Sequence, residues 1–348
     1  MEEKESGPED RRKLLPAAFS IDLEYNTNNS NMKKNYVAGV DIGGQTAKIG
    51  IVDKKGNILA RKVISTKYKD AGKFISLLSD SIREMTEDIG LDNINGVGVG
   101  APDGNYYTGD IVEATNLMWA KGKTVHFANE LSKMLGGLKV TITNDANAAA
   151  IGEMKYGAAK GMKNFIEITL GTGVGSGIVV DGKLVYGHDG FAGELGHTTA
   201  GRHTGRQCNC GKSGCLEAYA SAIGVARTAR EWLEMSDEPS ELRSLDKITS
   251  KDVYEAAKDG DKLALKVFEF TGRILGEKFA DFIAFSAPEA IVLFGGLARA
   301  KEFLREPIQK AMDENVLSLW KGKVQIVFSQ LKESDAAILG ASALAWEL

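Results

Sequence analysis

Apolar and polar positions along the chain follow two different periods, and together they predict an α/β protein. Short apolar runs bounded by glycine or polar turns predict buried strands, whereas apolar residues recurring every three or four positions predict helices. In the first half, the pattern predicts strands over 36–41, 47–52, 58–65, 95–100 and 139–143, and helices over 74–89 and 146–156. In the second half, it predicts strands over 164–170, 176–180, 183–186, 290–294 and 324–328, and helices near 221–235, 250–258, 261–286, 303–312 and 335–347.

The two halves open alike. Residues 40–53 contain Val-Asp-Ile-Gly-Gly and then Ile-Val-Asp, and residues 169–181 contain Thr-Leu-Gly-Thr-Gly and then Val-Val-Asp. Each half therefore begins as strand, glycine turn, strand, hairpin and strand. This weak internal repeat indicates duplicated α/β lobes that face one another across a cleft. Chance similarity between two β-hairpins is the alternative explanation.

The ends of the chain differ in character. Residues 1–34 are rich in Glu, Lys, Asn and Ser and have no amphipathic period, so they bury too little apolar surface to offset their ordering entropy. We predict that they form a disordered, dispensable extension. The last predicted helix, 335–347, could pack back on the first lobe. The predicted N-terminal lobe is 35–146 plus about 333–348, and the C-terminal lobe is 147–332.

Composition narrows the classes of partner. The 348 residues carry a formal net charge of −4, which does not favour a general nucleic-acid binder. No apolar run approaches the roughly 20 residues that span a bilayer, and the polar N-terminus does not resemble a signal peptide. We expect a cytoplasmic protein without nucleic-acid or membrane partners. Many of the forty glycines cluster, which suggests ligand-facing turns.

The three cysteines lie within eight positions, as Cys208, Cys210 and Cys215, and His197 precedes the first by eleven residues. Three thiolates and one imidazole form a closed tetrahedral ligand set for structural zinc. The alternatives are a disulfide with one spare thiol, or three unrelated buried cysteines. The odd number of cysteines and an expected reducing compartment disfavour the disulfide. We therefore predict a zinc loop in the second lobe.

Two carboxylates flank the predicted zinc ligands. Glu194 lies three residues before His197, and Glu217 lies two residues after Cys215. A purely structural zinc site does not need these carboxylates. The metal loop is therefore predicted to form one wall of a binding site.

Glycine turns follow three of the predicted strands. They are Asp41-Ile-Gly43-Gly44-Gln45-Thr46, Gly171-Thr172-Gly173 and Gly295-Gly296. Exposed N–H groups in the first two could cradle phosphate, with threonine hydroxyls as further donors, and Asp41 suits Mg²⁺. The third would allow close approach of a nucleotide base or ribose. None is a Walker A loop or a Gly-x-Gly-x-x-Gly fingerprint, and hairpins need glycines anyway.

Asn144 and Asp145 end a predicted strand and begin a helix. Ligands bind at that edge of open α/β sheets. A helix N-cap favours the same two residue types, and position alone does not separate these explanations.

In combination, these segments resemble the ROK family of sugar kinases and repressors, which has the actin-like ATPase (ribonuclease H-like) fold. The matching segments, in family order, are Asp41-Ile-Gly-Gly-Gln-Thr46, Asn144-Asp-Ala-Asn-Ala148, Leu170-Gly-Thr-Gly173, Glu194-Leu-Gly-His197 and Cys208-x-Cys-Gly-x-x-Gly-Cys215-x-Glu217. The resemblance runs from about Tyr36 to the C-terminus, and the cysteine signature is its most specific part. One departure is Gln45, which stands where the family usually has threonine.

The resemblance implies a glucokinase-like enzyme that transfers phosphate from ATP to a hexose, most often to the 6-hydroxyl of glucose. It implies Asp145 as general base, and sugar contacts from Asn144, Asp145, Glu194, His197 and Glu217, with 100–104 as a sugar-side loop. It implies Mg·ATP on Asp41, Gly43, Gly44, Thr46, Gly171, Thr172 and Gly173, and the nucleoside on Gly295 and Gly296. Structural zinc on His197, Cys208, Cys210 and Cys215, and a homodimer, complete these expectations.

Other functions within this resemblance stay open. Repressor members carry a helix-turn-helix domain ahead of the first strand, and the roughly 35 polar residues here are too few and too poor in apolar side chains to form one. This favours the enzyme over the transcription factor. A non-catalytic sugar sensor is a further alternative. Within kinases, the substrate could be fructose, N-acetylmannosamine, N-acetylglucosamine or allose.

Overall fold

The computed structural model of the protein describes residues 34–201 and 205–348. The predicted extension therefore falls almost wholly outside the described residues. The structure contains two five-stranded sheets, and the first lies in the N-terminal half of the chain. The sheet order is β3-β2-β1-β4-β7. Its strands are β1 (Tyr36–Ile42), β2 (Thr46–Asp53), β3 (Ile58–Ser65), β4 (Ile94–Gly100) and β7 (Val140–Thr143). Strands β1 to β3 pair antiparallel, while β4 and β7 continue the sheet in parallel with β1.

The second sheet repeats this arrangement, in the order β10-β9-β8-β11-β12. Its strands are β8 (Phe165–Leu170), β9 (Val174–Val180), β10 (Lys183–Leu184), β11 (Ala290–Phe294) and β12 (Gln325–Phe328). Again three antiparallel strands come first and two parallel strands follow. The predicted duplication of α/β lobes is confirmed, because two hairpins that matched by chance would not share the parallel strands as well.

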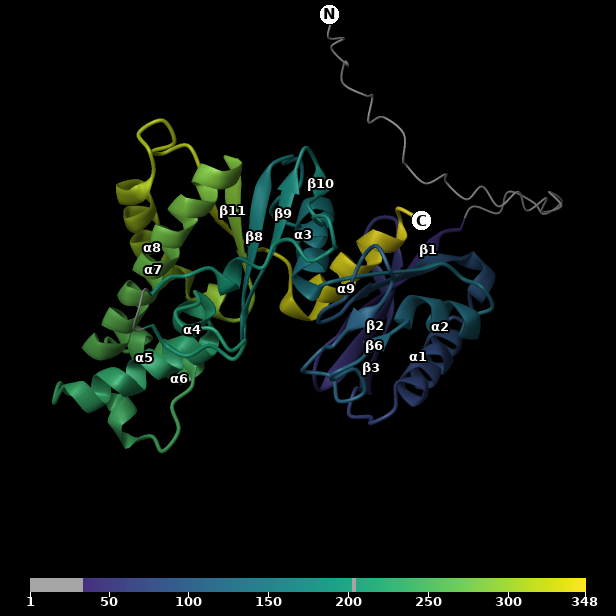
Figure 1. The fold of residues 1–348 in the computed structure, drawn as a ribbon, viewed down its shortest axis with the longest axis horizontal. Helices are drawn as coiled ribbons and strands as arrows, with labels where there is room; N and C mark the ends of the chain where they lie inside the picture. The colour runs from purple at the N-terminus through teal and green to yellow at the C-terminus, as the bar shows by residue number, and fades with distance from the viewer. Residues whose placement is uncertain (1–33, 202–204) are drawn as a thin grey trace, which may run out of the picture. The chain divides into compact units, whose positions relative to one another are not determined.

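Helices cover both sheets (Figure 1). They are α1 (Ala71–Met85), α2 (Phe127–Met134), α3 (Asp145–Tyr156), α4 (Glu217–Ala220), α5 (Ala222–Met235), α6 (Ser250–Lys258), α7 (Lys262–Ser286), α8 (Lys301–Asn315) and α9 (Glu333–Ala345). Among the described residues, no helix is long and apolar enough to cross a membrane.

The structure corrects several predicted boundaries. Helix α1 begins at Ala71 because the Asp70 carboxylate accepts the Lys73 N–H at 2.9 Å, and it ends four residues before the predicted position. Strand β10 has only two of the four predicted residues. Helix α2 and the short pair β5 (Ile111–Val112) with β6 (Thr124–Val125) were not predicted. Tertiary packing selects such short elements more than local propensity does.

The two faces of the second sheet show the period of two expected for a strand. On one face, Ile166 and Ile168 join a core that includes the apolar residues of α7 and α8. On the other face, Phe165 and Val179 pack with Ala150 of α3. In the first lobe, Phe74 of α1 stacks on Trp119 with ring centroids 5.0 Å apart. Each sheet therefore lies between apolar side chains of its own lobe.

Helix α9 returns from the second half of the chain to the first sheet, where it packs on β1 and β4 and crosses α3 (Figure 1). Glycines make this close approach possible. A Cβ atom added at Gly98 would lie 1.9 Å from the Ala341 carbonyl oxygen, and one added at Gly152 would lie 2.9 Å from the Gly340 Cα. Helix α3, which begins at Asp145, is thus held between α9 and the second sheet.

Replacing Gly98 with alanine is expected to lower the free energy of unfolding by about 1–3 kcal/mol, because the new methyl group would overlap backbone atoms of α9. The shift of the urea unfolding midpoint, followed by tryptophan fluorescence, measures this effect. Gly72→Ala is the matched control, since Gly72 lies in the first turn of α1 with its nearest outside atom 3.3 Å away. An equal loss in both variants would contradict the prediction.

Candidate functional site

Acidic side chains gather at one edge of the first sheet. Asp41 is the penultimate residue of β1, Asp103 follows β4, and Asp145 follows β7. Because these three strands run parallel, their carboxyl ends meet at the same edge. Asp41, Asp103 and Glu194 all lie close enough to act electrostatically on Asp145. The cluster therefore joins segments that are more than 150 residues apart.

Asn144 and Asp145 have different local roles. Asn144 is the N-cap of α3, and its side-chain oxygen accepts the Ala146 N–H at 2.9 Å. Asn144 therefore caps the helix through its side-chain oxygen, while its NH2 group offers two further donors. Asp145 follows in the first helical turn, with its side chain exposed. Asn144 therefore fixes the start of α3, and Asp145 places its carboxylate at the edge of the sheet.

The Asp145 carboxylate is accessible to water, but protein surrounds it on most sides. This desolvation is the largest cause that raises its pKa to about 6, and the negative charge of Asp41 is the next. The Ala146 N–H, 2.9 Å from Asp145 Oδ1, opposes the increase. A carboxylate with a pKa close to neutrality is suited to accept and release a proton.

The first glycine turn is tight. The Gly43 N–H donates to the Thr46 carbonyl at 2.9 Å, which leaves Gly44 and Gln45 at the tip. Asp41 pairs with Lys48 across the two strands, and their charged groups are 3.6 Å apart. Because side chains alternate along a strand, Thr46 lies on the same face of β2 as Lys48. With Gln45 at the tip of the turn, Thr46 therefore lies on the sheet face that carries Asp41.

The second and third glycine turns are neighbours. Strand β8 leads into Gly171, and β11, paired in parallel with β8, leads into Gly295. Gly295 has a φ of +98°, and a Cβ atom there would lie 2.6 Å from the Leu170 carbonyl oxygen. The Gly171 N–H closes the second turn on the Gly173 carbonyl at 3.0 Å. No hydrogen bond in 34–201 or 205–348 joins this pair of turns to the 43–46 turn.

A pocket of about 220 Å³ opens beside the second turn. It is lined by Thr172, by Ala222, Ile223, Ala226 and Arg230 of α5, and by the segment from Lys247 to Ser250. Apolar side chains of α5 and Ile248 line it together with hydroxyl and basic groups, a mixture found in many small-molecule sites. The sequence pattern gave no sign of this pocket, because it forms where three separate segments, Thr172, α5 and 247–250, meet.

The predicted metal ligands form one cluster. The ligand atoms of His197, Cys208, Cys210 and Cys215 all lie within 4.8 Å of one another. The Sγ atoms of Cys210 and Cys215 are 3.7 Å apart, and tetrahedral zinc with bonds of about 2.3 Å separates two sulfurs by about 3.8 Å. All three cysteines are free, whereas a disulfide would bring two sulfurs to about 2.05 Å. The donor set fits structural zinc.

The metal cluster touches the rest of the site through two carboxylates. His197 directs Nδ1 toward Cys208 Sγ at 3.8 Å and Nε2 toward Glu194 at 3.9 Å. Glu217 lies 3.6 Å from Cys208 Sγ and accepts the Val174 N–H, at the end of the second glycine turn, at 2.9 Å. The metal loop therefore lies between the acidic cluster and the 171–173 turn.

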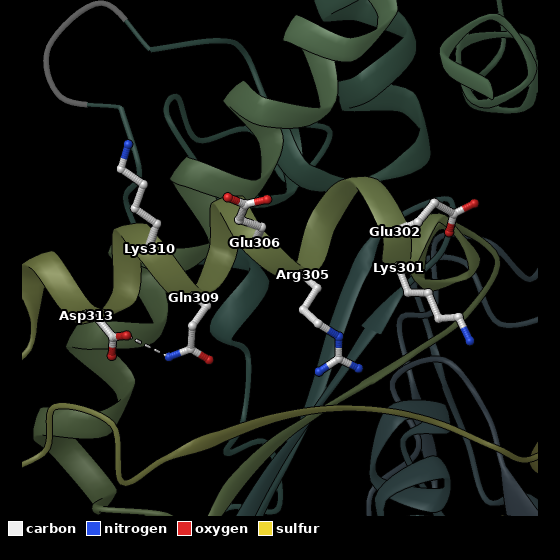
Figure 2. A pocket seen from close by; sticks show the side chains of 7 residues that line it. All are labelled: Lys301, Glu302, Arg305, Glu306, Gln309, Lys310 and Asp313. Carbon is white, nitrogen blue, oxygen red and sulfur yellow. Dashed lines mark hydrogen bonds between the residues drawn. The ribbon is translucent and has the colours of Figure 1, made fainter. Parts of the chain in front are cut away.

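A larger hollow of about 720 Å³ follows the exposed side of α8 and contains none of these residues (Figure 2). Its described lining is Lys301, Glu302, Arg305, Glu306, Gln309, Lys310 and Asp313, all from one helix. Acidic and basic side chains alternate there, and Arg305 donates to the Ile326 carbonyl at 3.0 Å. The lining provides no convergent charge for one ligand, so we do not assign the chemistry to it.

Comparison with known proteins gives a consistent result. A family profile described as "ROK family" matches residues 37–347 of the chain. A glucokinase of Halalkalibacterium halodurans is 36% identical over 316 residues, which cover 89% of this chain and 94% of that protein. A glucokinase of Thermotoga maritima is 35% identical over 321 residues, covering 90% and 98%. The structure of a ROK family glucokinase from Streptomyces griseus, in complex with glucose and AMPPNP, is similar with a TM-score of 0.75 and 31% identity, covering 90% of this chain and 100% of that one.

Proposed function

The chain belongs to the ROK family, and from that premise we propose that it is an ATP-dependent hexose kinase that converts D-glucose to glucose 6-phosphate. The observation that carries the proposal is the position of Asp145. Its carboxylate has a pKa raised to about 6 and lies in one cluster with Glu194, which faces the metal loop. The relatives named as glucokinases, and the one bound to glucose and AMPPNP, support the choice of substrates.

In the proposed reaction, Asp145 is the general base. A sugar oxygen forms a bond to the γ-phosphorus of ATP, the bond from that phosphorus to the bridging oxygen breaks, and ADP leaves. The hydroxyl proton passes to the Asp145 carboxylate. Phosphoryl transfer depends mainly on positioning and on neutralising charge, and a positioned base typically adds about 10²–10⁴-fold.

We assign the sugar hydroxyls to four side chains around the base: Asn144, Glu194, His197 and Glu217. A buried sugar needs each hydroxyl paired, and carboxylates are strong acceptors. Zinc held by His197 and the three cysteines would be structural and would supply no Lewis-acid step. With Nδ1 on the metal, His197 carries its proton on Nε2 and can donate it to the sugar.

We assign the nucleotide to the glycine turns. Gly43, Gly44 and Thr46, together with 171–173, would hold the phosphates through N–H and hydroxyl donors. Asp41 offers a carboxylate oxygen, the ligand type that Mg²⁺ prefers, and the ion would neutralise phosphate charge. Gly295 and Gly296 would approach the nucleoside, and the 220 Å³ pocket beside Thr172 has room at their edge of the sheet for its base.

The remaining assignments are also proposals. The lobes would be 35–146 plus about 333–348 and 147–332, a division that the packing of α9 on β1 and β4 supports. A cytoplasmic, homodimeric enzyme follows from the family resemblance.

The principal test is coupled ADP release with glucose, fructose, N-acetylmannosamine, N-acetylglucosamine and allose. Hexose binding by calorimetry without ADP release from any sugar would favour a regulator instead.

The value of kcat/KM for the hexose is expected to fall as the pH drops below about 6. A raised carboxyl pKa means that Asp145 is an active base above that value and a protonated, inactive acid below it. The loss should approach tenfold per pH unit. Because ATP also titrates near this pH, the ratio of wild type to Asp145→Asn at each pH isolates the carboxylate. A ratio that stays constant from pH 5 to 8 would contradict this assignment.

A further inference from the structure

Arg206 is a buried arginine that the proposed reaction does not use. Its side chain is only 9% exposed, and it lies in the metal loop two residues before Cys208. Its guanidinium donates to the Thr228 hydroxyl at 2.8 Å and to Glu231 at 2.6 Å, and it lies 4.8 Å from the centre of the Tyr219 ring. A planar group with five donors suits such a site, whereas a lysine ammonium does not.

The guanidinium also reaches backbone carbonyls. Nη1 lies 3.3 Å from the Ala218 oxygen and 3.4 Å from the Gly224 oxygen. In addition, the backbone N–H of Arg206 donates to the Tyr219 hydroxyl at 3.0 Å. These partners belong to α4 and α5, so one side chain fastens the metal loop to two helices that follow it in the chain.

Those two helices contact both halves of the proposed site. Helix α4 begins at Glu217, which accepts the Val174 N–H and lies beside Cys208. Helix α5 begins at Ala222, whose N–H donates to the Gly171 carbonyl at 2.8 Å. The position of the metal loop relative to Glu217 therefore depends on the contacts that Arg206 makes.

We propose that Arg206 is a positioning residue for both hexose binding and metal retention. It holds the loop so that His197 and Glu217 face the same ligand while the cysteines stay in ligand geometry. The hexose part rests on the proposed function, and the metal part does not. Residues that orient metal ligands from outside typically change metal affinity or activity by about 10–100-fold when they are replaced.

The test compares two Arg206 variants with a matched control. Arg206→Lys keeps the positive charge but loses the planar set of guanidinium donors, and Arg206→Met keeps only an unbranched apolar side chain. Arg227→Met is the control, because Arg227 binds the same Glu231 at 2.7 Å but is 37% exposed. In the described part of the metal loop, its single contact is the Gln207 carbonyl at 3.5 Å. The measurements are zinc release to a metallochromic chelator, KM for hexose and for ATP, and thermal unfolding.

Both Arg206 variants are expected to release zinc about tenfold faster and to raise the hexose KM about tenfold, with the ATP KM changed less than about twofold. Arg227→Met should leave all three values within about twofold. A lower melting temperature with unchanged zinc release and hexose KM would overturn the proposal and leave only a stabilising ion pair. If Arg206→Met does not fold, Arg206→Lys decides the question. If the wild-type protein phosphorylates no hexose, the proposed function fails, and the zinc release rates still test the positioning.

Discussion

Replacing Asp145 with asparagine is expected to lower kcat for hexose phosphorylation by about 10²–10⁴-fold, with a much smaller change in the hexose KM. Asparagine has nearly the same shape, and its oxygen can still accept the Ala146 N–H that Asp145 accepts at 2.9 Å. Helix α3 keeps its own cap on Asn144. The variant therefore removes the proton acceptor and preserves the surrounding structure. Initial rates of ADP release at saturating ATP, over a range of hexose concentrations, give both constants.

Asp103→Asn is the matched control for this variant. Asp103 is a second carboxylate that acts on Asp145, and its negative charge contributes to the raised pKa of the base. Its backbone has a φ of +52°, which asparagine adopts as readily as aspartate. We expect kcat near the wild-type value and an acid limb moved to lower pH. Asp145→Asn with near-normal kcat would exclude Asp145 as the base.

Removing zinc is expected to abolish most of the activity and to weaken hexose binding by about 10–100-fold. Cys208 and Cys215 are buried, and without a metal four ligand groups within 4.8 Å of one another would lose the interaction that holds them together. Glu217, beside Cys208, would then lose its fixed position. Activity and hexose affinity should be measured before and after treatment with a zinc-selective chelator in excess Mg²⁺.

Re-addition of zinc should restore activity if the loop refolds around it. Cys215→Ser should reproduce the effect of the chelator. Ser213→Ala is the control within the same loop, because the Ser213 hydroxyl donates to the exposed Gln207 side chain at 3.2 Å and, within 34–201 and 205–348, to no metal ligand. An apoprotein with unchanged hexose affinity would contradict the proposed coupling between the metal and the sugar wall.

Local sequence determined the parts of this protein that depend on short-range physics. The apolar segment that follows the 53–57 hairpin loop placed β3 at its observed bounds, 58–65, and the repeat of strand and glycine turn indicated two similar lobes. The spacing from Cys208 to Cys215, with His197 upstream, was sufficient to predict the metal cluster. A hairpin, a helix period and a ligand loop are each specified by residues that are near neighbours in the chain.

Tertiary structure decided what requires distant residues to meet. The raised pKa of Asp145 comes first from desolvation and then from the charges of Asp41, Glu194 and Asp103, which no local pattern links to it. The pocket beside Thr172 forms only because α5 and 247–250 face each other, and the role inferred for Arg206 exists only through its contacts with α4 and α5. Desolvation, charge interaction and shape are properties of the assembled packing, whereas the sequence alone specifies the elements that pack.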